Sequence, residues 1–435
     1  MPRKNKSIAS LACLVLLCIT AIATPERIPI PGEPMQPGDV AWMLTATGLV
    51  LLMTPGLSFF YGGMVSPKNV ISTMLQSFIC LGVVSLLWVV VGFSLCFGES
   101  IGGFIGNPME FFMMRGVGGA THAALSPTIP LILFALFQLK FAVITPALVT
   151  GAFAERVRFS SYLIFITLFS IFVYAPLAHW TWHPQGFLRQ WGVLDFAGGT
   201  VVHMSAGIAA LVGAVVLGRR TAHIEKVSHA PANIPYVLLG TGMLWFGWFG
   251  FNAGSALAAN ENAAMAFATT NTASAAAMLA WIFFDGARGR KPSALGACIG
   301  AVVGLVAITP GAGFVTIPHS IVIGVVASVV SNIAVHWKSS TTLDDTLDVF
   351  PCHGVGGIVG MILTGVFAKD VGLIHGETHT FFVHLLGLLV VTVYVAVVSY
   401  ILYRITNAII PMRVTEEDER IGLDLSQHDE SVTTH

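Results

Sequence analysis

The chain has 435 residues, of which 55% are hydrophobic and only 10% are charged, and its formal net charge is −1. Its apolar residues come in blocks long enough to cross a bilayer, which indicates a polytopic membrane protein. The sequence has no basic face or arm that could neutralise phosphates, so nucleic acid is excluded as a partner.

Residues 1–23 resemble a cleavable signal peptide. The basic start "MPRKNK" is followed by an apolar stretch that ends in the small-residue pattern Ala21-Ile22-Ala23. The alternative is an uncleaved first helix, for which the stretch is short. Cleavage would leave residues 24–39 as an N-terminal segment on the outer face.

Eleven apolar segments of spanning length follow and predict an all-α membrane domain over residues 40–405, with a cytoplasmic tail over 406–435. Glycine is abundant, with 45 residues, and recurs inside these segments. Small residues let helices approach closely, so we expect a dense bundle with a narrow path. The predicted segments are 40–63, 70–97, 129–153, 160–182, 197–218, 234–255, 262–285, 293–309, 318–336, 350–368 and 379–405.

Lysine and arginine are distributed unequally between the connections. The loops after even-numbered segments contain three, namely Arg115, Arg189 and Lys369. Cytoplasmic loops retain positive charge, so we expect the N-terminus outside and the C-terminus inside. Thirteen follow odd-numbered segments or lie in the tail: Lys68, Arg156, Arg158, Arg219, Arg220, Lys226, Arg288, Arg290, Lys291, Lys338, Arg404, Arg413 and Arg420.

Two halves of five helices in series must have opposite orientations in the membrane, and short matches between the halves indicate such an inverted repeat. Segment five carries His203-x-x-x-Gly-Ile and segment ten carries His353-x-x-x-Gly-Ile, each with an aspartate upstream, Asp195 and Asp348. Likewise "VITPA" in segment three is similar to "AITPG" at the end of segment eight. We therefore expect a five-plus-five inverted repeat followed by one final helix.

Four ionisable side chains lie inside or at the mouth of the predicted spans: Lys140, Asp195, His203 and His353. Such groups are costly in lipid and mark either a pathway or a structural pairing. Asp195 precedes small residues at a helix start, which is typical of an N-cap for the amides of Gly198 or Thr200. Lys140 can extend toward the interface, and nothing in the sequence places it on a pathway.

The two histidines are candidates for a pair in the middle of the membrane. His203 lies eight residues beyond Asp195, or ~12 Å at the helical rise, and His353 enters its helix from the opposite side. Two neutral imidazoles that meet there can share one proton; the alternative is two separate packing residues. No cysteine or acidic ligand accompanies them at helical spacing, so neither a metal nor another cofactor is expected.

Aromatic side chains complete this constellation, and the alternative for the tryptophans is a role as interfacial anchors. An aromatic face attracts a small cation by ~0.5–2 kcal/mol, which is too little to offset complete dehydration of a buried charge. A protonated amine would therefore lose its proton before crossing, whereas potassium has no proton to lose. The residues concerned are Phe137, Phe141, Trp180, Trp182, Trp248, Phe251 and Ser255.

Several ordered motifs resemble the ammonium transporter and Rh superfamily, specifically its bacterial ammonium transporter branch, over residues 40–430. They are "FYGGMVSPKNV", "TGAFAERVRFSSYLIF", "LDFAGGTVVHMSAGIAALVGA", "WFGWFGFNAGSA", "ITPGAGFV", "DVFPCHGVGGIVG" and "RVTEEDERIGLDLSQHDE". The segment "HPQGFLRQWG" and the loop 98–128 are individual to this sequence.

The resemblance implies eleven helices, a homotrimer and one narrow pore per subunit. On the matching positions, Trp182, Phe141 and Ser255 would recruit ammonium, with Asp195 next to them. Phe141 would stack on Phe251 to form a gate.

Below that gate, the resemblance implies that His203 and His353 line the pore. The substrate would be ammonium, with methylammonium as an analogue, and ammonia and its proton would cross the inner membrane separately. The tail would pack on a neighbouring subunit, and PII-type signal proteins would dock on that face.

Three rival functions remain at this point. An ammonium sensor would use the same binding residues with little transport. A neutral-gas channel of Rh type would depend less on the recruiting aromatics. An intramembrane enzyme would need a nucleophile or metal beside the histidines, and the sequence supplies neither, so an enzyme is not expected.

Overall fold

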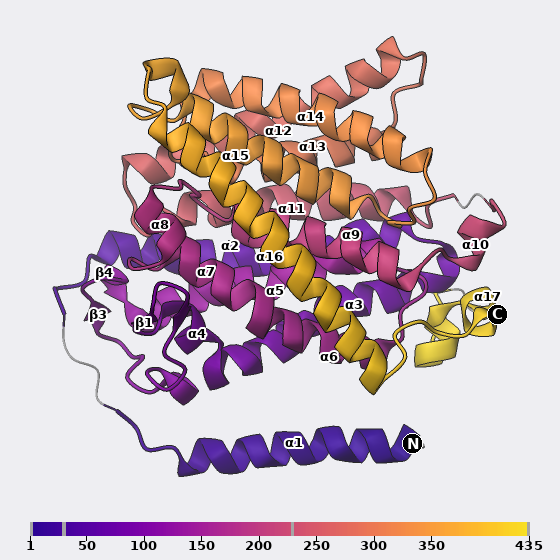
Figure 1. Cartoon of the computed structure of the whole chain (residues 1–435), viewed down its shortest axis with the longest axis horizontal. Coiled ribbons are helices and arrows are strands. Elements are labelled where there is room, and N and C mark those ends of the chain that lie inside the picture. Colours follow the sequence, from indigo (N-terminus) through magenta and orange to yellow (C-terminus); the bar gives the residue numbers. More distant parts are fainter. Residues whose placement is uncertain (1–2, 28–31, 228–229, 433–435) are drawn as a thin grey trace.

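The protein is a bundle of long helices, with its first helix lying apart from the rest (Figure 1). The computed structural model describes residues 3–27, 32–227 and 230–432. Parts of the predicted signal peptide, outer segment and tail, namely residues 1–2, 28–31 and 433–435, lie outside the described residues.

The first half of the bundle follows the predicted segments closely. Its connections contain η1 (Pro67–Asn69), α8 (Phe187–Trp191) and α10 (Thr221–Ile224). Three of its spans contain π-helical turns, namely η2 (Trp88–Gly92), η4 (Ser170–Tyr174) and η5 (Gly199–Met204). The other helices are α1 (Arg3–Ala23), α2 (Pro37–Met64), α3 (Val70–Leu87), α4 (Phe93–Phe97), α5 (Leu131–Phe153), α6 (Phe159–Phe169), α7 (Ala175–Trp182) and α9 (Ser205–Leu217).

The second half and the tail complete the bundle. The tail contains α17 (Glu416–Ile421) and η8 (Asp424–His428). The second half consists of α11 (Ile234–Gly254), α12 (Glu261–Ala287), α13 (Ala294–Ile308), α14 (Ile317–Ser339), η6 (Phe350–Val355), α15 (Gly356–Phe367), η7 (Leu373–His375) and α16 (His379–Ile409).

Ten helical stretches among the described residues are long and apolar enough to cross a membrane. The remaining predicted segment, 293–309, corresponds to α13, which has 15 residues and is roughly 22 Å long. A hydrocarbon core is about 30 Å thick, so α13 falls short of a full span by length. The predicted count of eleven is therefore not confirmed.

The loop between α4 and α5 departs from the purely helical expectation. It contains two short hairpins, in which β1 (Ser100–Ile101) pairs with β2 (Ile105–Gly106) and β3 (Thr121–His122) pairs with β4 (Ser126–Pro130). A short helix, η3 (Phe112–Met114), lies between the hairpins. Because β4 extends to Pro130, α5 begins at Leu131 and not at residue 129 as predicted.

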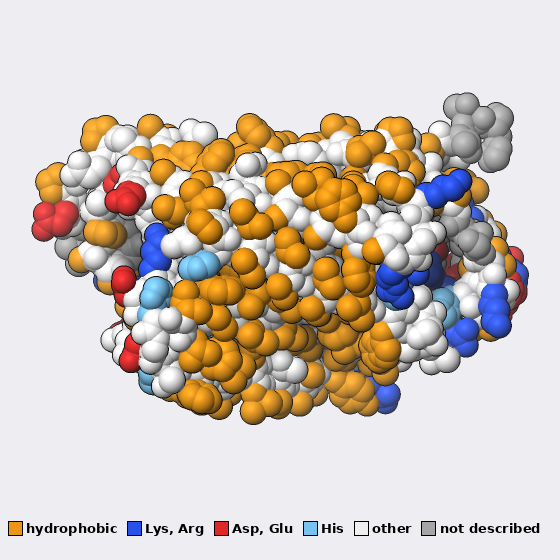
Figure 2. Space-filling view, turned by 90° about the horizontal axis from the view of Figure 1, so that it is seen from above, with side chains coloured by type: hydrophobic (Ala, Val, Ile, Leu, Met, Phe, Trp, Pro, Cys, Tyr) orange, Lys and Arg blue, Asp and Glu red, His pale blue; other side chains and the backbone are white. Residues whose placement is uncertain are grey.

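The surface matches a multi-pass membrane protein. Figure 2 shows one face on which hydrophobic side chains cover the middle while charged side chains gather toward the two ends. Large apolar side chains such as Phe246, Phe283 and Leu389 are more than half exposed. A belt of this kind is suited to contact with lipid or with another apolar surface.

Candidate functional site

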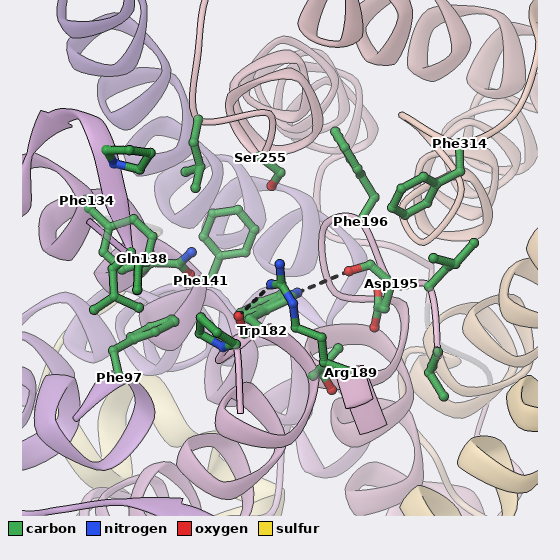
Figure 3. A pocket seen from close by; sticks show the side chains of 18 of the residues that line it. Phe97, Phe134, Gln138, Phe141, Trp182, Arg189, Asp195, Phe196, Ser255 and Phe314 are labelled. Carbon is green, nitrogen blue, oxygen red and sulfur yellow. Dashed lines mark hydrogen bonds between the residues drawn. The ribbon is translucent and has the colours of Figure 1, made fainter. Parts of the chain in front are cut away.

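A cavity of about 500 Å³ lies at one end of the bundle, where loops and helix ends meet (Figure 3). Four residues that the sequence marked as candidates for recruitment line it: Phe141, Trp182, Asp195 and Ser255. Lys140, although adjacent to Phe141, is not among the lining residues. We call this cavity the vestibule.

Two stacked rings lie at the inner side of the vestibule. Phe141 of α5 and Phe251 of α11 are buried, and their ring centroids lie 4.1 Å apart at an interplanar angle of 24°. The ring of Trp182 meets Phe141 edge-on, with centroids 5.6 Å apart. Two aromatic faces in direct contact therefore lie beside the vestibule.

The polar atoms around these rings have defined roles. The Ser255 hydroxyl donates to the backbone oxygen of Phe251 at 2.8 Å, so its oxygen lone pairs remain able to accept hydrogen bonds. The indole nitrogen of Trp182 donates to the backbone oxygen of Asp195 at 3.2 Å. This bond fixes the orientation of the indole that borders the vestibule.

The Asp195 carboxylate is occupied by the start of its own helix. Oδ1 accepts from the amides of Gly198 at 2.8 Å and Gly199 at 2.6 Å, and Oδ2 accepts from the amide and the hydroxyl of Thr200 at 2.7 and 2.5 Å. Gly198 has φ +111°, a left-handed conformation that favours glycine. Asp195 therefore organises the start of its own helix.

The structure brings the two histidines together in the middle of the bundle. Nδ1 of His203 and Nδ1 of His353 lie 3.3 Å apart, and both rings are buried. A hydrogen bond between these nitrogens requires one ring to carry the proton on Nδ1 and the other to carry it on Nε2. The Nε2 atom of His203 is buried and has no hydrogen-bond partner among the described residues.

Glycines make this meeting of the histidines sterically feasible. A Cβ added at Gly207 would lie 2.1 Å from the backbone nitrogen of Gly354, the residue after His353. Reciprocally, a Cβ added at Gly357 would lie within 3.3 Å of Met204, the residue after His203. The two helices thus make equivalent contacts with each other, as an inverted repeat would require.

A model of the Ammonium Transporter Family matches residues 41–433. The chain belongs to this family. Ammonium transporters of Aquifex aeolicus and Bacillus subtilis are 46% and 45% identical to it over 91% of this chain, which corresponds to 93% and 98% of those relatives.

Solved structures agree with the assignment to the ammonium transporter family. Saccharomyces cerevisiae Mep2 is similar with a TM-score of 0.83 and 36% identity, covering 88% of each chain. A structure described as a sensor Amt protein has a TM-score of 0.83 and 30% identity, covering 90% of this chain and 98% of its own.

In this member of the ammonium transporter family, the aspartate of the second half that corresponds to Asp195 is not the one expected from the sequence. The residue that corresponds to Asp195 is Asp345, and not Asp348, because it precedes His353 by eight positions as Asp195 precedes His203. Its carboxylate accepts from the amides of Val349 at 3.1 Å and Phe350 at 2.8 Å. Asp348 instead forms an ion pair with Lys338 at 2.6 Å.

Trp248 and His384 also support the site; from the sequence, Trp248 was only one of the aromatic candidates and His384 was not a candidate. The Trp248 ring stacks on His203 with centroids 5.2 Å apart, and its nitrogen donates to Thr309 at 2.9 Å. Its spacing of three residues from Phe251 on α11 was a usable signal. His384 of α16 accepts from the amide of Leu194 at 2.9 Å and so holds the loop before Asp195; its sequence position gave no indication of this contact.

The end of the transporter opposite the vestibule carries a buried charge network. Arg220 contacts Glu155 at 2.6 Å and Asp344 at 2.9 Å. Burial acts to raise the pKa of Asp344, but the hydrogen bonds from Arg220 and the charges of Arg156 and Arg220 outweigh it and lower this pKa to about 2. The pKa of Glu155 is also lowered, since the Arg220 charge outweighs burial.

The tail docks beside this network on the chain's own loops. Glu419 accepts from the amide and hydroxyl of Thr221, each at 2.9 Å, and from Arg413 at 2.7 Å. Asp424 accepts from the amides of Ile71 and Ser72 near the start of α3. The resemblance implies packing on a neighbouring subunit, whereas these contacts join the tail to loops of its own chain.

Proposed function

We propose that this protein recruits ammonium at the outer face, removes its proton and conducts ammonia through a narrow pore to the cytoplasm. The observation that carries the proposal is one continuous series of groups from the vestibule inward. Trp182 meets Phe141, Phe141 stacks on Phe251, and Phe251 lies 6.1 Å from His203, which is paired with His353.

In the recruitment step, a cation in the vestibule contacts the faces of Trp182 and Phe141 and donates to the Ser255 hydroxyl. Each aromatic face contributes ~0.5–2 kcal/mol, and the fixed charge of Asp195 adds a weak attraction. These groups concentrate ammonium without removing all of its water, because full burial of the charge costs several kcal/mol. The gate of Phe141 and Phe251 therefore favours neutral ammonia.

In the pore, each of the paired imidazoles has an Nε2 atom that points away from the other ring, and the two Nε2 atoms have opposite hydrogen-bonding roles. One accepts a hydrogen bond and the other donates one. Ammonia is both a donor and an acceptor, so it can be passed along this pair. When the accepting Nε2 takes up the proton released by ammonium, the shared proton moves to the other ring, and that ring gives up its own Nε2 proton. One proton enters and one leaves, the donor and acceptor roles of the two rings are exchanged, and the proton crosses separately from ammonia. Potassium lacks a transferable proton and is excluded.

We propose the following assembly. The protein is a homotrimer of the bacterial inner membrane, with its N-terminus outside and its C-terminus inside, and α13 provides an eleventh crossing in a five-plus-five repeat. Residues 1–23 are a signal peptide, 24–39 an outer segment, 40–405 the membrane domain and 406–435 a tail. A PII-type signal protein docks on the cytoplasmic face, as the tail motif suggests.

A sensor is the second candidate function, because the sensor Amt protein shares this fold with a TM-score of 0.83. A sensor would bind ammonium in the vestibule and carry little current. A neutral-gas channel of Rh type would conduct without saturable recruitment. The current carried by the protein distinguishes these possibilities.

The test is the ammonium-driven current of the full chain reconstituted in vesicles. We expect a saturable current with ammonium, a smaller one with methylammonium and none with potassium. His203→Ala and Asp195→Ala each abolish the selective current, because the first removes half of the proton-sharing pair and the second leaves buried amides unsatisfied.

The matched control is His375→Ala, since His375 is exposed on the connection before α16 and outside the series of groups. It should retain wild-type current. Full current from both His203→Ala and Asp195→Ala would refute the assigned roles. Ammonium binding without current in the unmodified protein would favour the sensor.

A further inference from the structure

Arg189 is a positive charge at a vestibule whose ligand is itself a cation. It belongs to the short helix α8, lies among the lining residues and is exposed. Its Nη1 donates to the backbone oxygen of Trp182 at 2.9 Å. Figure 3 shows its side chain directed into the cavity, between Trp182 and Asp195.

This charge is not neutralised by an ion pair. No carboxylate in the described part of the chain lies within ion-pair distance of Arg189, whereas Arg220, Arg290, Arg413 and Arg420 all have acidic partners. Of the described residues lining the vestibule, only Arg189 and Asp195 carry a formal charge. The Asp195 carboxylate is 7% exposed and engaged in four hydrogen bonds.

We propose that Arg189 sets the affinity of the vestibule for ammonium by electrostatic repulsion, an inference that rests on the proposed function. The guanidinium is charged at every physiological pH, so the repulsion is permanent. It opposes the attraction of the Trp182 and Phe141 faces and the weak attraction of the Asp195 charge. Ammonium therefore binds at a higher concentration than these groups and Ser255 would otherwise require.

The repulsion has a characteristic dependence on salt. Arg189 is exposed to solvent, so mobile ions screen its charge, and the screening length falls from ~30 Å at about 10 mM salt to ~4 Å at about 0.5 M. Added salt should therefore raise the apparent affinity of the wild-type protein. A purely structural role of the bond to the Trp182 carbonyl would show no such dependence.

The experiment compares the wild type with Arg189→Gln and Arg189→Lys in reconstituted vesicles. Glutamine retains a donor for the Trp182 carbonyl and removes the charge, whereas lysine retains the charge. At ~10 mM sodium chloride, Arg189→Gln should lower the half-saturating ammonium concentration about fivefold, with unchanged maximal current. At ~0.5 M the difference should fall below about twofold, and Arg189→Lys should match the wild type in both salts.

Lys369→Gln is the matched control, because it makes the same change in net charge at a residue outside the vestibule lining. It should leave the half-saturating concentration unchanged. An unchanged value in Arg189→Gln, an equal shift in Arg189→Lys, or a shift that persists at high salt would overturn the proposal. Gel filtration of each variant checks that the fold is retained.

A second measurement distinguishes failure of the proposed transport function from failure of the role proposed for Arg189. If the wild type carries no current, methylammonium binding is followed through tryptophan fluorescence on the same variants, since Trp182 lines the vestibule. A salt-dependent gain of affinity in Arg189→Gln would then support the role of Arg189 without transport. Equal affinity of all variants would overturn it.

Discussion

Trp245 and Trp248 lie three residues apart on α11, and only Trp248 contacts the histidine pair. The Trp248 ring is 2% exposed, stacks on His203 and donates to Thr309. Trp245 is partly buried, and its indole nitrogen has no partner among the described residues. Of these two tryptophans in one helix, Trp248 therefore packs against the histidine pair and Trp245 does not.

We predict that Trp248→Leu lowers both stability and selectivity. Loss of the ring leaves a cavity beside His203, which costs ~3–5 kcal/mol in the free energy of unfolding and admits water next to polar nitrogen atoms. Thermal unfolding and the ratio of ammonium to potassium current measure the two effects. Trp245→Leu is the control and should change both quantities less; equal effects of the two substitutions would contradict the assigned role.

Individual residues also show where sequence reasoning reached its limit. The pattern from Asp195 to His203 was sufficient to predict a helix cap and a buried imidazole. In the second half, "DDTLD" offers three carboxylates, and the motif alone did not identify the one that caps the helix. Asp348 adopts a left-handed conformation with φ +58° and points to Lys338, so Asp345 takes the capping position. That choice depends on the backbone path, which local spacing does not specify.

Among the structural elements, the helix segments were predictable and their irregularities were not. The length of the apolar segments was sufficient to predict the positions of the long helices, because a segment that crosses lipid must satisfy all its backbone hydrogen bonds internally and does so as a helix. The hairpins of the outer loop and the π-helical turns depend on tertiary contacts, which hydropathy does not reflect. The contacts of Trp182 with Asp195 and of Phe141 with Phe251 join distant parts of the chain, and only the family resemblance suggested them.

Arg220 joins three connections at the end of the bundle opposite the vestibule, and the stability of this junction should depend on pH. Arg220→Gln removes the partner of Glu155 and Asp344, which should lower the free energy of unfolding at pH 7 by about 3 kcal/mol. The folded-state pKa of Asp344 lies below its unfolded value, so its stabilisation is present above pH ~4 and is lost as the pH falls toward 2.

Without Arg220, burial of the Asp344 carboxyl is opposed mainly by the charge of Arg156, and the pKa of Asp344 should rise. The stability deficit of Arg220→Gln should therefore be largest near neutral pH and decrease below pH ~5, as the carboxyl becomes protonated. Thermal unfolding in detergent across this range measures the deficit. Arg219→Gln is the control, because Arg219 bonds to His223 and not to a carboxylate. A deficit that grows in acid would contradict the network.

In the molecule as a whole, α1 is the element that does not join the bundle (Figure 1). Its apolar side chains are exposed, with Leu16 at 64% and Ile22 at 87%. An isolated apolar helix is unfavourable in water, and removal of α1 would leave the rest of the bundle intact. This arrangement agrees with the proposed signal peptide.

We predict that the mature protein begins at Thr24. Intact-mass measurement and N-terminal sequencing of protein purified from membranes identify the first residue. Ala23→Leu places a bulky side chain at the cleavage position and should retain residues 1–23, whereas Ala12→Leu within the apolar stretch should be processed normally. A mature protein that begins at Met1 would show that α1 is a permanent helix.

The histidines lie in η5 and η6, where the helix makes its wider, π-helical turn. Such a turn contains one residue more than a regular helix, and it is less favourable for the backbone. Deletion of one residue within either turn would restore regular helical geometry and rotate the histidine by about 100° relative to the rest of its helix. The backbone would gain in regularity, and the two imidazoles would no longer meet. Selection for stability and selection for the proposed histidine pair would therefore act in opposite directions on the length of these two turns.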